Sequence, residues 1–247
     1  MNRWVEKTAV VTGASSGIGA AICVALADAG INVVGLARRA ERIDKLKSQV
    51  SGNGKITSRK CDVSSSEELA ATFKWIHETF GGIHIMINNA GVFYGGGITD
   101  VGNDMLSEKD LLATIDINLK GTIMCARHAI ASMRSNDFNG HVVNINSIAG
   151  RYVPWSSKFN VYTSSKYGVT GFTEALLNEL SDHKNKIKVT SLSPGLVRTE
   201  MTELPGCMDL PALRPEDIAD AVLYVLSTPP SVNINELTIT PVTERRM

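Results

Sequence analysis

The chain has 247 residues, and its 25 lysines and arginines balance its 25 aspartates and glutamates. Because no basic or acidic run stands out, nucleic acid and anionic membranes are disfavoured as partners, and we expect a small molecule instead. The four cysteines, Cys23, Cys61, Cys125 and Cys207, are widely spaced, which argues against both a disulfide scaffold and a metal site. No segment resembles a signal peptide or approaches the roughly 18 apolar residues of a membrane span. We therefore expect a cytoplasmic protein without a membrane partner.

Short apolar runs alternate with stretches of helical periodicity along the whole chain. The apolar runs predict strands at 8–12, 32–36, 55–60, 83–87, 141–145, 186–192 and 236–240. The helical patterns lie at 17–29, 42–50, 66–80 with Ser66 as N-cap, 108–133 with a bend near Gly121, 160–180 and 215–226. The glycine-rich stretch 92–106 predicts a loop. The alternation predicts a single α/β domain over residues 1–247, a doubly wound parallel sheet of about seven strands with helices on both faces.

A glycine-rich turn at 12–19 lies where the first strand leads into the first helix. Gly13 suits a tight turn, Gly17 a close approach of pyrophosphate to the backbone, and Gly19 close packing of helix on strand. Its G-x-x-x-G-x-G spacing differs from the commoner G-x-G-x-x-G. The position of this turn, between the first strand and the first helix, favours a dinucleotide-binding loop in a Rossmann fold. The residues predicted to contact the dinucleotide here are Gly13, Ser15, Ser16, Gly17, Ile18 and Gly19.

Arg38 and Arg39 follow the second strand, where an acidic residue would bind a free ribose 2′-hydroxyl. Guanidinium groups suit a 2′-phosphate instead. The pair therefore favours NADP(H) over NAD(H). The alternative is two arginines that end a strand in solvent.

Tyr162 and Lys166 are four residues apart within a predicted helix, so their side chains project from one face. A phenol with a pKa of about 10 exchanges protons poorly at neutral pH unless a neighbouring charge favours its anion. A lysine one turn away supplies such a charge. Because this spacing is common on ordinary helix surfaces, the pair carries weight only together with the other motifs.

Five motifs resemble those of the short-chain dehydrogenase/reductase family; they follow one another in the family's order and span nearly the whole chain. They are the loop at 12–19, Asn88 to Gly91, Asn118, Ser147 with Tyr162 and Lys166, and the stretch 194–199. Within the family, the opening Arg3-Trp4 and the segments 34–38, 226–229 and 237–244 resemble the insect farnesol dehydrogenases and their vertebrate relative, dehydrogenase/reductase member eleven.

The resemblance implies a role for each residue of the catalytic motif. Tyr162 would be the general acid/base, and Ser147 would hydrogen-bond the substrate oxygen. Lys166 would lower the pKa of Tyr162 and hold the nicotinamide ribose. Asn118 would support a water chain to Lys166, although a satisfied helix amide is the alternative interpretation.

The resemblance also implies further cofactor contacts. Asp62 and Val63 would contact adenine. The predicted nicotinamide side comprises Asn89, Ala90, Gly91, Pro194, Gly195, Val197 and Thr199. Ser16 departs from the family pattern, because members that prefer NADP often carry a basic residue there. Cofactor choice would then depend on Arg38 and Arg39.

Apolar residues around the tyrosine motif and a predicted lid at 199–214 indicate an adaptable apolar cavity. The predicted substrate contacts are Phe93, Ile148, Val153, Trp155, Phe159, Met201 and Leu204. A lipophilic alcohol or its carbonyl fits such a cavity, with farnesol or a similar isoprenoid alcohol as the first choice. Arg151 and Arg198 leave an anionic substrate open.

Two other functions compete with this prediction. One is a reductase of steroid or xenobiotic ketones, and the other is a catalytically idle NADP(H)-binding sensor or scaffold. The complete set of Ser147, Tyr162 and Lys166 argues against an idle protein. The long helices at 108–133 and 160–180 resemble those through which family members pair, which implies a homodimer or homotetramer.

Overall fold

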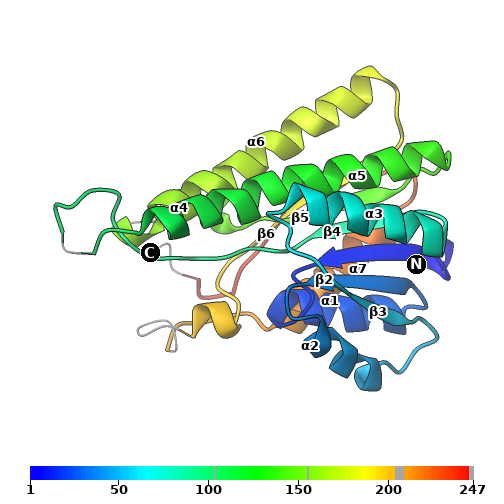
Figure 1. Ribbon diagram of the computed structural model, residues 1–247, viewed down its shortest axis with the longest axis horizontal. Coiled ribbons are helices and arrows are strands. Elements are labelled where there is room, and N and C mark those ends of the chain that lie inside the picture. The colour runs from blue at the N-terminus through cyan, green and yellow to red at the C-terminus, as the bar shows by residue number, and fades with distance from the viewer. Residues whose placement is uncertain (103, 155, 204–208, 245–247) are drawn as a thin grey trace.

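The computed structural model describes residues 1–102, 104–154, 156–203 and 209–244. Its centre is a seven-stranded parallel sheet of order β3-β2-β1-β4-β5-β6-β7 (Figure 1). The strands are β1 Thr8–Thr12, β2 Asn32–Ala37, β3 Ile56–Lys60, β4 Ile85–Asn88, β5 His141–Ile145, β6 Lys188–Pro194 and β7 Glu236–Ile239. The predicted doubly wound fold is confirmed.

Helices follow the strands in alternation. The α-helices are α1 Gly17–Asp28, α2 Ala40–Asp44, α3 Ser66–Phe80, α4 Glu108–Ile115, α5 Thr122–Ser135, α6 Asn160–Asp182 and α7 Pro215–Ser227. Five short 3-10 helices are η1 Asn2–Trp4, η2 Lys45–Gln49, η4 Ile148–Gly150, η5 Ser157–Phe159 and η6 Glu200–Thr202, and η3 Asp116–Gly121 is a π-helix. Among the described helices, none combines the length and hydrophobicity needed to cross a bilayer.

Both faces of the sheet are buried, which explains why the central strands are apolar at successive positions. Val11 packs in a core with α1 and α7, and its neighbour Val10 packs in a second core with α3, α5 and α6. Figure 1 shows α4, α5 and α6 running together on one side of the sheet. The two cores fix the sheet, so the turns at its carboxyl edge project from a rigid base.

Some local predictions differ from the structure in their bounds or type. The stretch 42–50 is divided between α2 and the 3-10 helix η2. The N-cap of α3 is Ser65, whose Oγ accepts a hydrogen bond from the Glu68 amide at 3.2 Å, and Ser66 is already inside the helix. The predicted strand at 186–192 begins later and runs from Lys188 to Pro194.

The long helix predicted at 108–133 is interrupted by the π-helix η3 between α4 and α5. Gly121 ends this π-helical segment in close contact with Val63, since an added Cβ would lie 3.0 Å from Val63 Cγ2. The Thr122 hydroxyl donates to the Asn118 carbonyl at 2.8 Å and satisfies that acceptor. The irregularity therefore lies against the turn after β3, beside the site described next.

Candidate functional site

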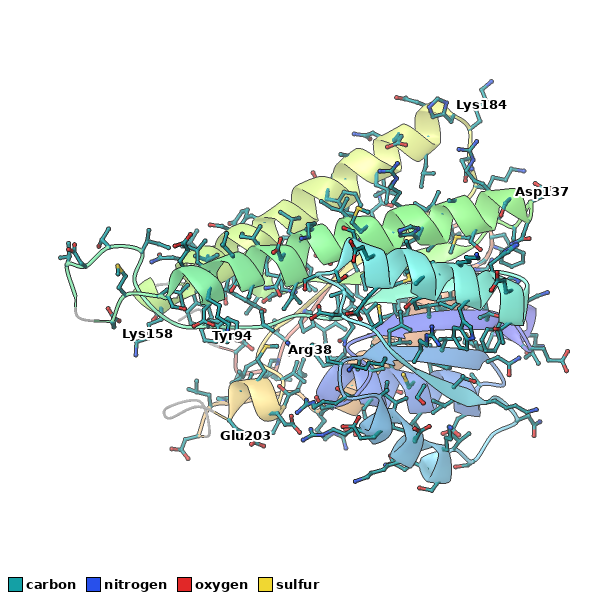
Figure 2. The ribbon with its side chains drawn as sticks, in the orientation of Figure 1. Arg38, Tyr94, Asp137, Lys158, Lys184 and Glu203 are labelled. Carbon is teal, nitrogen blue, oxygen red and sulfur yellow. The ribbon has the colours of Figure 1, made fainter. Side chains whose placement is uncertain are left out.

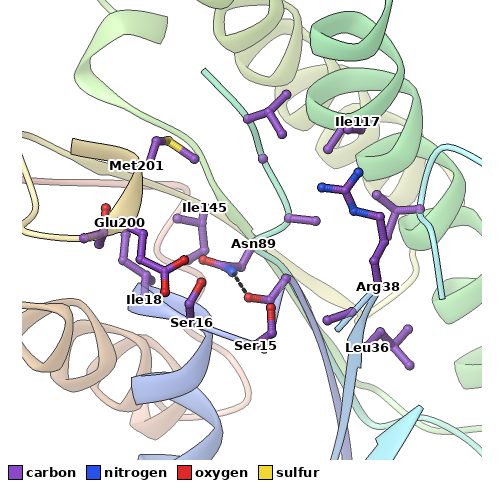
Figure 3. A pocket seen from close by; sticks show the side chains of 18 of the residues that line it. Ser15, Ser16, Ile18, Leu36, Arg38, Asn89, Ile117, Ile145, Glu200 and Met201 are labelled. Atoms are coloured by element: carbon purple, nitrogen blue, oxygen red, sulfur yellow. Dashed lines mark hydrogen bonds between the residues drawn. The ribbon is translucent and has the colours of Figure 1, made fainter. Parts of the chain in front are cut away.

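A polar pocket opens at the carboxyl edge of the sheet, where the turns after β1, β2, β3 and β4 converge (Figure 3). We call this space, of about 240 Å³, the polar pocket. It is lined by Gly13, Ser15, Ser16, Gly17, Ile18, Leu36, Ala37, Arg38, Arg39, Cys61, Asp62, Val63, Asn89, Ala90, Gly91, Val92, Ile117, Ile145, Asn146, Tyr162, Lys166, Thr199, Glu200 and Met201. The residues that the sequence did not predict here are Leu36, Ala37, Cys61, Val92, Ile117, Ile145, Asn146 and Glu200.

The glycine turn has the geometry that a phosphate-binding loop needs. Gly13 has a φ of +66°, and a Cβ there would lie 2.9 Å from the Ala90 Cα. Gly19 is buried and packs against the turn, where an added Cβ would meet the Gly13 carbonyl oxygen. The N-cap of α1, Ser16, makes no side-chain capping bond. The Ser16 hydroxyl therefore leaves the first amides of α1 uncapped, and a cofactor phosphate fits them.

The turn after β4 is fastened directly to the glycine loop. The Thr12 hydroxyl accepts hydrogen bonds from the amides of Asn89 and Ala90, each at 3.0 Å. The Asn89 side-chain amide donates in return to the Thr12 carbonyl at 2.9 Å. These bonds bring two predicted contact segments, distant in the chain, to adjoining walls of the polar pocket.

Arginines lie at the end of the polar pocket nearest β2. Arg38 is exposed, and none of the residues that the structure describes forms a hydrogen bond or ion pair with it. Arg39 instead donates to Glu200 Oε2 at 3.3 Å, and Arg42 donates to Glu200 Oε1 at 2.8 Å. The hydrogen bond from Arg42 and the charges of both arginines lower the pKa of Glu200. Figure 3 shows Arg38 on one side of the pocket and Glu200 on the other, beside Ser16 and Ile18.

A second, mainly apolar space adjoins the polar pocket. We call it the apolar cavity; its volume is about 180 Å³. Its lining comprises Ile18, Phe93, Asn146, Ser147, Ile148, Ala149, Tyr152, Pro154, Phe159, Tyr162, Pro194, Gly195, Leu196, Val197, Thr199, Met201, Thr202 and Glu244. The residues shared with the polar pocket are Ile18, Asn146, Tyr162, Thr199 and Met201. Tyr162 thus lies at the junction of the two spaces.

Ser147, Tyr162 and Lys166 are brought together as the sequence predicted. Ser147 hydrogen-bonds the Tyr162 side chain, while burial raises the pKa of that phenol and outweighs the hydrogen bond. Lys166 Nζ donates to the Ile145 carbonyl at 3.0 Å and lies 5.7 Å from the centre of the Tyr162 ring. Burial lowers the pKa of Lys166 to about 8. The expected lowering of the Tyr162 pKa by Lys166 is not found; burial dominates instead.

Asn118 is buried on η3, and its side-chain amide is hydrogen-bonded through both its oxygen and its nitrogen. Its Oδ1 accepts from the Val92 amide at 2.8 Å, and its Nδ2 donates to the Val92 carbonyl at 3.0 Å and to Ser165 Oγ at 3.1 Å. The side chain therefore fastens the segment after β4 to α6, and none of these bonds reaches Lys166. The water chain through Asn118 stays a prediction.

Aromatic rings form one wall of the apolar cavity. Phe93 lies 4.8 Å from Phe159 and 5.3 Å from Tyr162 between ring centres, and Phe159 lies 6.2 Å from Tyr162. Ile148 and Met201 line the same cavity. The structure does not bring Val153 there, since this residue is 67% exposed and does not line the cavity. Trp155 and Leu204 lie outside the described residues.

The segment after β6 is placed differently from the prediction. Pro194, Gly195 and Val197 line the apolar cavity and not the polar pocket, while Thr199 lines both. Glu244, at the end of the segment 237–244, was not predicted in the site; its Oε2 accepts from the Leu196 amide at 3.3 Å at the edge of this cavity. It belongs to the chain after β7, so only the fold brings it near.

Comparisons with known proteins fit this geometry. The family model of the short chain dehydrogenases matches residues 7–205. A farnesol dehydrogenase of Aedes aegypti is 45% identical over 250 residues, covering 99% of this chain and 100% of that protein. Dehydrogenase/reductase SDR family member 11 of Mus musculus is 36% identical over 255 residues, covering 98% and 96%. The closed form of a serine dehydrogenase complexed with NADP+ superposes with a TM-score of 0.85 at 30% identity, covering 96% of each chain.

Proposed function

Because the chain belongs to the short-chain dehydrogenase family, we propose that this oxidoreductase interconverts a lipophilic alcohol and its carbonyl with NADP(H). The observation that carries the proposal is the position of Tyr162, which is bonded to Ser147 where the polar pocket meets the apolar cavity. A proton donor at that junction can reach a substrate bound in the apolar cavity, next to a nicotinamide bound in the polar pocket.

Several features of the polar pocket support NADP(H) as the cofactor. The uncapped amides at the start of α1 fit the pyrophosphate, and Arg38 is available for a 2′-phosphate. Asp62 and Val63 line the pocket where adenine would bind. The structural relative that is complexed with NADP+ supports the same cofactor. When bound, the cofactor supplies or accepts the hydride.

The protein contributes positioning and proton transfer. In reduction, the Tyr162 hydroxyl donates its proton to the carbonyl oxygen, and in oxidation its phenolate accepts the proton of the alcohol. The Ser147 hydroxyl holds the same substrate oxygen. Lys166 would hold the nicotinamide ribose beside them. Since burial raises the pKa of Tyr162, the neutral donor form prevails at pH 7 and suits reduction without further activation.

The apolar cavity supports an isoprenoid alcohol such as farnesol as the substrate. Its wall of Phe93, Phe159 and Tyr162 offers apolar surface to a hydrocarbon chain. The insect relative is named for farnesol, and it matches over nearly its full length. Reduction of steroid or xenobiotic ketones is the competing activity, and an idle NADP(H)-binding sensor is the competing class.

The organisation of the whole protein remains predicted. We propose one domain over residues 1–247 that assembles into a homodimer or homotetramer through the long helices α5 and α6. Sedimentation of the purified protein would measure the oligomeric state. The predicted lid at 199–214 includes residues outside the described part of the chain, and the cytoplasmic location likewise stays a prediction.

A substrate screen tests the proposal. Purified protein is supplied with farnesol, geraniol, a steroid ketone or an aromatic ketone, each with NADP(H) and with NAD(H), and initial rates are measured in both directions. We expect the highest kcat/KM with an isoprenoid alcohol and NADP+. A higher value for the ketones would favour the competing reductase, and NADPH binding without turnover of any compound would favour the sensor.

A further inference from the structure

Glu200 is a carboxylate that lines the polar pocket and forms ion pairs with Arg39 and Arg42. Glu200 begins the short helix η6, directly after Thr199, and Glu203, labelled in Figure 2, directly follows that helix. Both oxygens of Glu200 are engaged, Oε2 by Arg39 and Oε1 by Arg42. Neither Glu200 nor Arg42 belongs to a motif of the sequence, and the bridge joins residues about 160 positions apart.

The ion pair with Glu200 places Arg39 between two anions, namely that carboxylate and the 2′-phosphate of a bound cofactor. A cofactor 2′-phosphate is best bound by guanidinium groups, and Arg39 lines the polar pocket together with Glu200. Arg39 cannot present its full set of donors to the phosphate while Glu200 holds one of them. The ion pairs are also weak, since the side chains of Arg39 and Glu200 are 48% and 55% exposed. A phosphate can therefore displace this carboxylate, but at a cost in affinity.

Arg42 bonds the other carboxylate oxygen of Glu200 and does not line the polar pocket. Its contact with Glu200, at 2.8 Å, is shorter than the 3.3 Å contact from Arg39. Arg42 can thus keep the carboxylate after Arg39 has turned to a phosphate. Without Arg42, Glu200 would have Arg39 as its one remaining ion-pair partner among the described residues.

We propose that Glu200 competes with the cofactor 2′-phosphate for Arg39, and that Arg42 is a positioning residue that draws Glu200 away from it. The inference rests on the proposed use of NADP(H). It assigns two specificity-determining residues whose effects on cofactor affinity have opposite signs. Removing Glu200 strengthens NADPH binding, and removing Arg42 weakens it although Arg42 does not touch the phosphate. NADH lacks the 2′-phosphate, so its affinity is indifferent to both changes.

A double-mutant cycle tests this arrangement. Dissociation constants for NADPH and NADH are measured by fluorescence titration for the wild type, Glu200→Gln, Arg42→Ala and the double variant. We expect Glu200→Gln to bind NADPH about fivefold more tightly and Arg42→Ala about fivefold more weakly, as an exposed ion pair allows. The double variant should match Glu200→Gln, because Arg42 acts through Glu200. NADH should change by less than about twofold throughout.

Lys47→Ala is the matched control, because it removes one positive charge from the neighbouring helix η2 and breaks an exposed pair with Asp44. Its NADPH affinity should equal that of the wild type. Equal NADPH affinity in Glu200→Gln and wild type would overturn the inference, as would parallel changes for NADH. Weaker NADPH binding on adding Arg42→Ala to Glu200→Gln would assign Arg42 a direct contact instead. A wild type with no preference for NADPH would refute the proposed cofactor itself, before any variant is compared.

Discussion

The polar pocket and the apolar cavity share Tyr162 but are built in different ways. The polar pocket is formed mainly at the turns that directly follow parallel strands, and these turns are held in place by glycines and by the Thr12 to Asn89 bonds. The apolar cavity is made of side chains from the short helices η4 and η5, the segment after β6, and Glu244 near the end of the chain. Backbone geometry is shared by proteins that bind one cofactor, whereas side chains can change with the substrate. The two spaces should therefore respond independently to substitution.

The largest difference between the responses of the two spaces is expected for Arg38→Asp, which should change cofactor preference and leave substrate binding unchanged. The substitution removes charge-assisted hydrogen bonds to a 2′-phosphate and places a like charge beside it. We expect the ratio of kcat/KM for NADP+ to that for NAD+ to fall about 100-fold, with the farnesol KM unchanged. Steady-state rates with both cofactors measure this ratio.

Arg134→Asp is the control for Arg38→Asp, because Arg134 is an exposed arginine on α5 in its last turn. It makes the same change of charge away from the polar pocket. Its cofactor ratio should stay at the wild-type value. An unchanged ratio in Arg38→Asp would show that the 2′-phosphate is bound elsewhere.

Phe159→Ala probes the apolar cavity. The substitution removes a ring that packs against Phe93 and faces Tyr162. Loss of about 2 kcal/mol of apolar contact raises the farnesol KM about thirtyfold, while the KM for NADP+ is unchanged. A short secondary alcohol, which cannot reach the ring, serves as the comparison substrate. An equal loss with the short alcohol would show that Phe159 positions Tyr162 and does not bind the hydrocarbon chain.

The pH dependence of the two reaction rates follows from the protonation of Tyr162, which lies where the polar pocket meets the apolar cavity. Because burial raises its pKa, the phenolate needed for oxidation is a minor form at neutral pH. We expect the oxidation rate to rise up to about tenfold per pH unit from pH 6 to pH 8, while the rate of reduction does not rise. Initial rates in both directions across this range provide the measurement.

Ser147→Ala extends the pH experiment, because the hydrogen bond from Ser147 lowers the pKa of Tyr162. Its removal raises that pKa further and moves the oxidation profile to higher pH. Cofactor affinity should not change, as Ser147 lines the apolar cavity and not the polar pocket. An oxidation rate independent of pH would contradict proton removal by Tyr162.

The difference between the polar pocket and the apolar cavity also explains how much of the site the sequence could predict. Gly13 and Gly17 were assigned correctly to the turn after β1, since their positive φ values are a backbone requirement that only glycine meets easily. Helices and strands followed from periodicity, except where tertiary contact intervened, as at η3 against Val63. Glu200 and Glu244 were not assigned to the site from the sequence, because the fold alone brings them there.

Substrate contacts could be predicted least. Val153 has the apolar character of a cavity residue, yet its side chain is exposed, while the neighbouring Tyr152 and Pro154 line the cavity. In a loop without regular periodicity, sequence does not determine which side chain faces inward. The polar chemistry of the site was therefore predictable in outline, and the shape of the apolar cavity was not.

Tyr162→Phe tests the central claim most directly, because it removes one hydroxyl from the junction and keeps the ring that packs on Phe93. Turnover of farnesol with NADP+ and the NADPH dissociation constant are measured on the same preparation. We predict that turnover falls about a thousandfold while the dissociation constant changes by less than about twofold. Turnover close to the wild-type rate in the folded variant would contradict proton transfer by Tyr162.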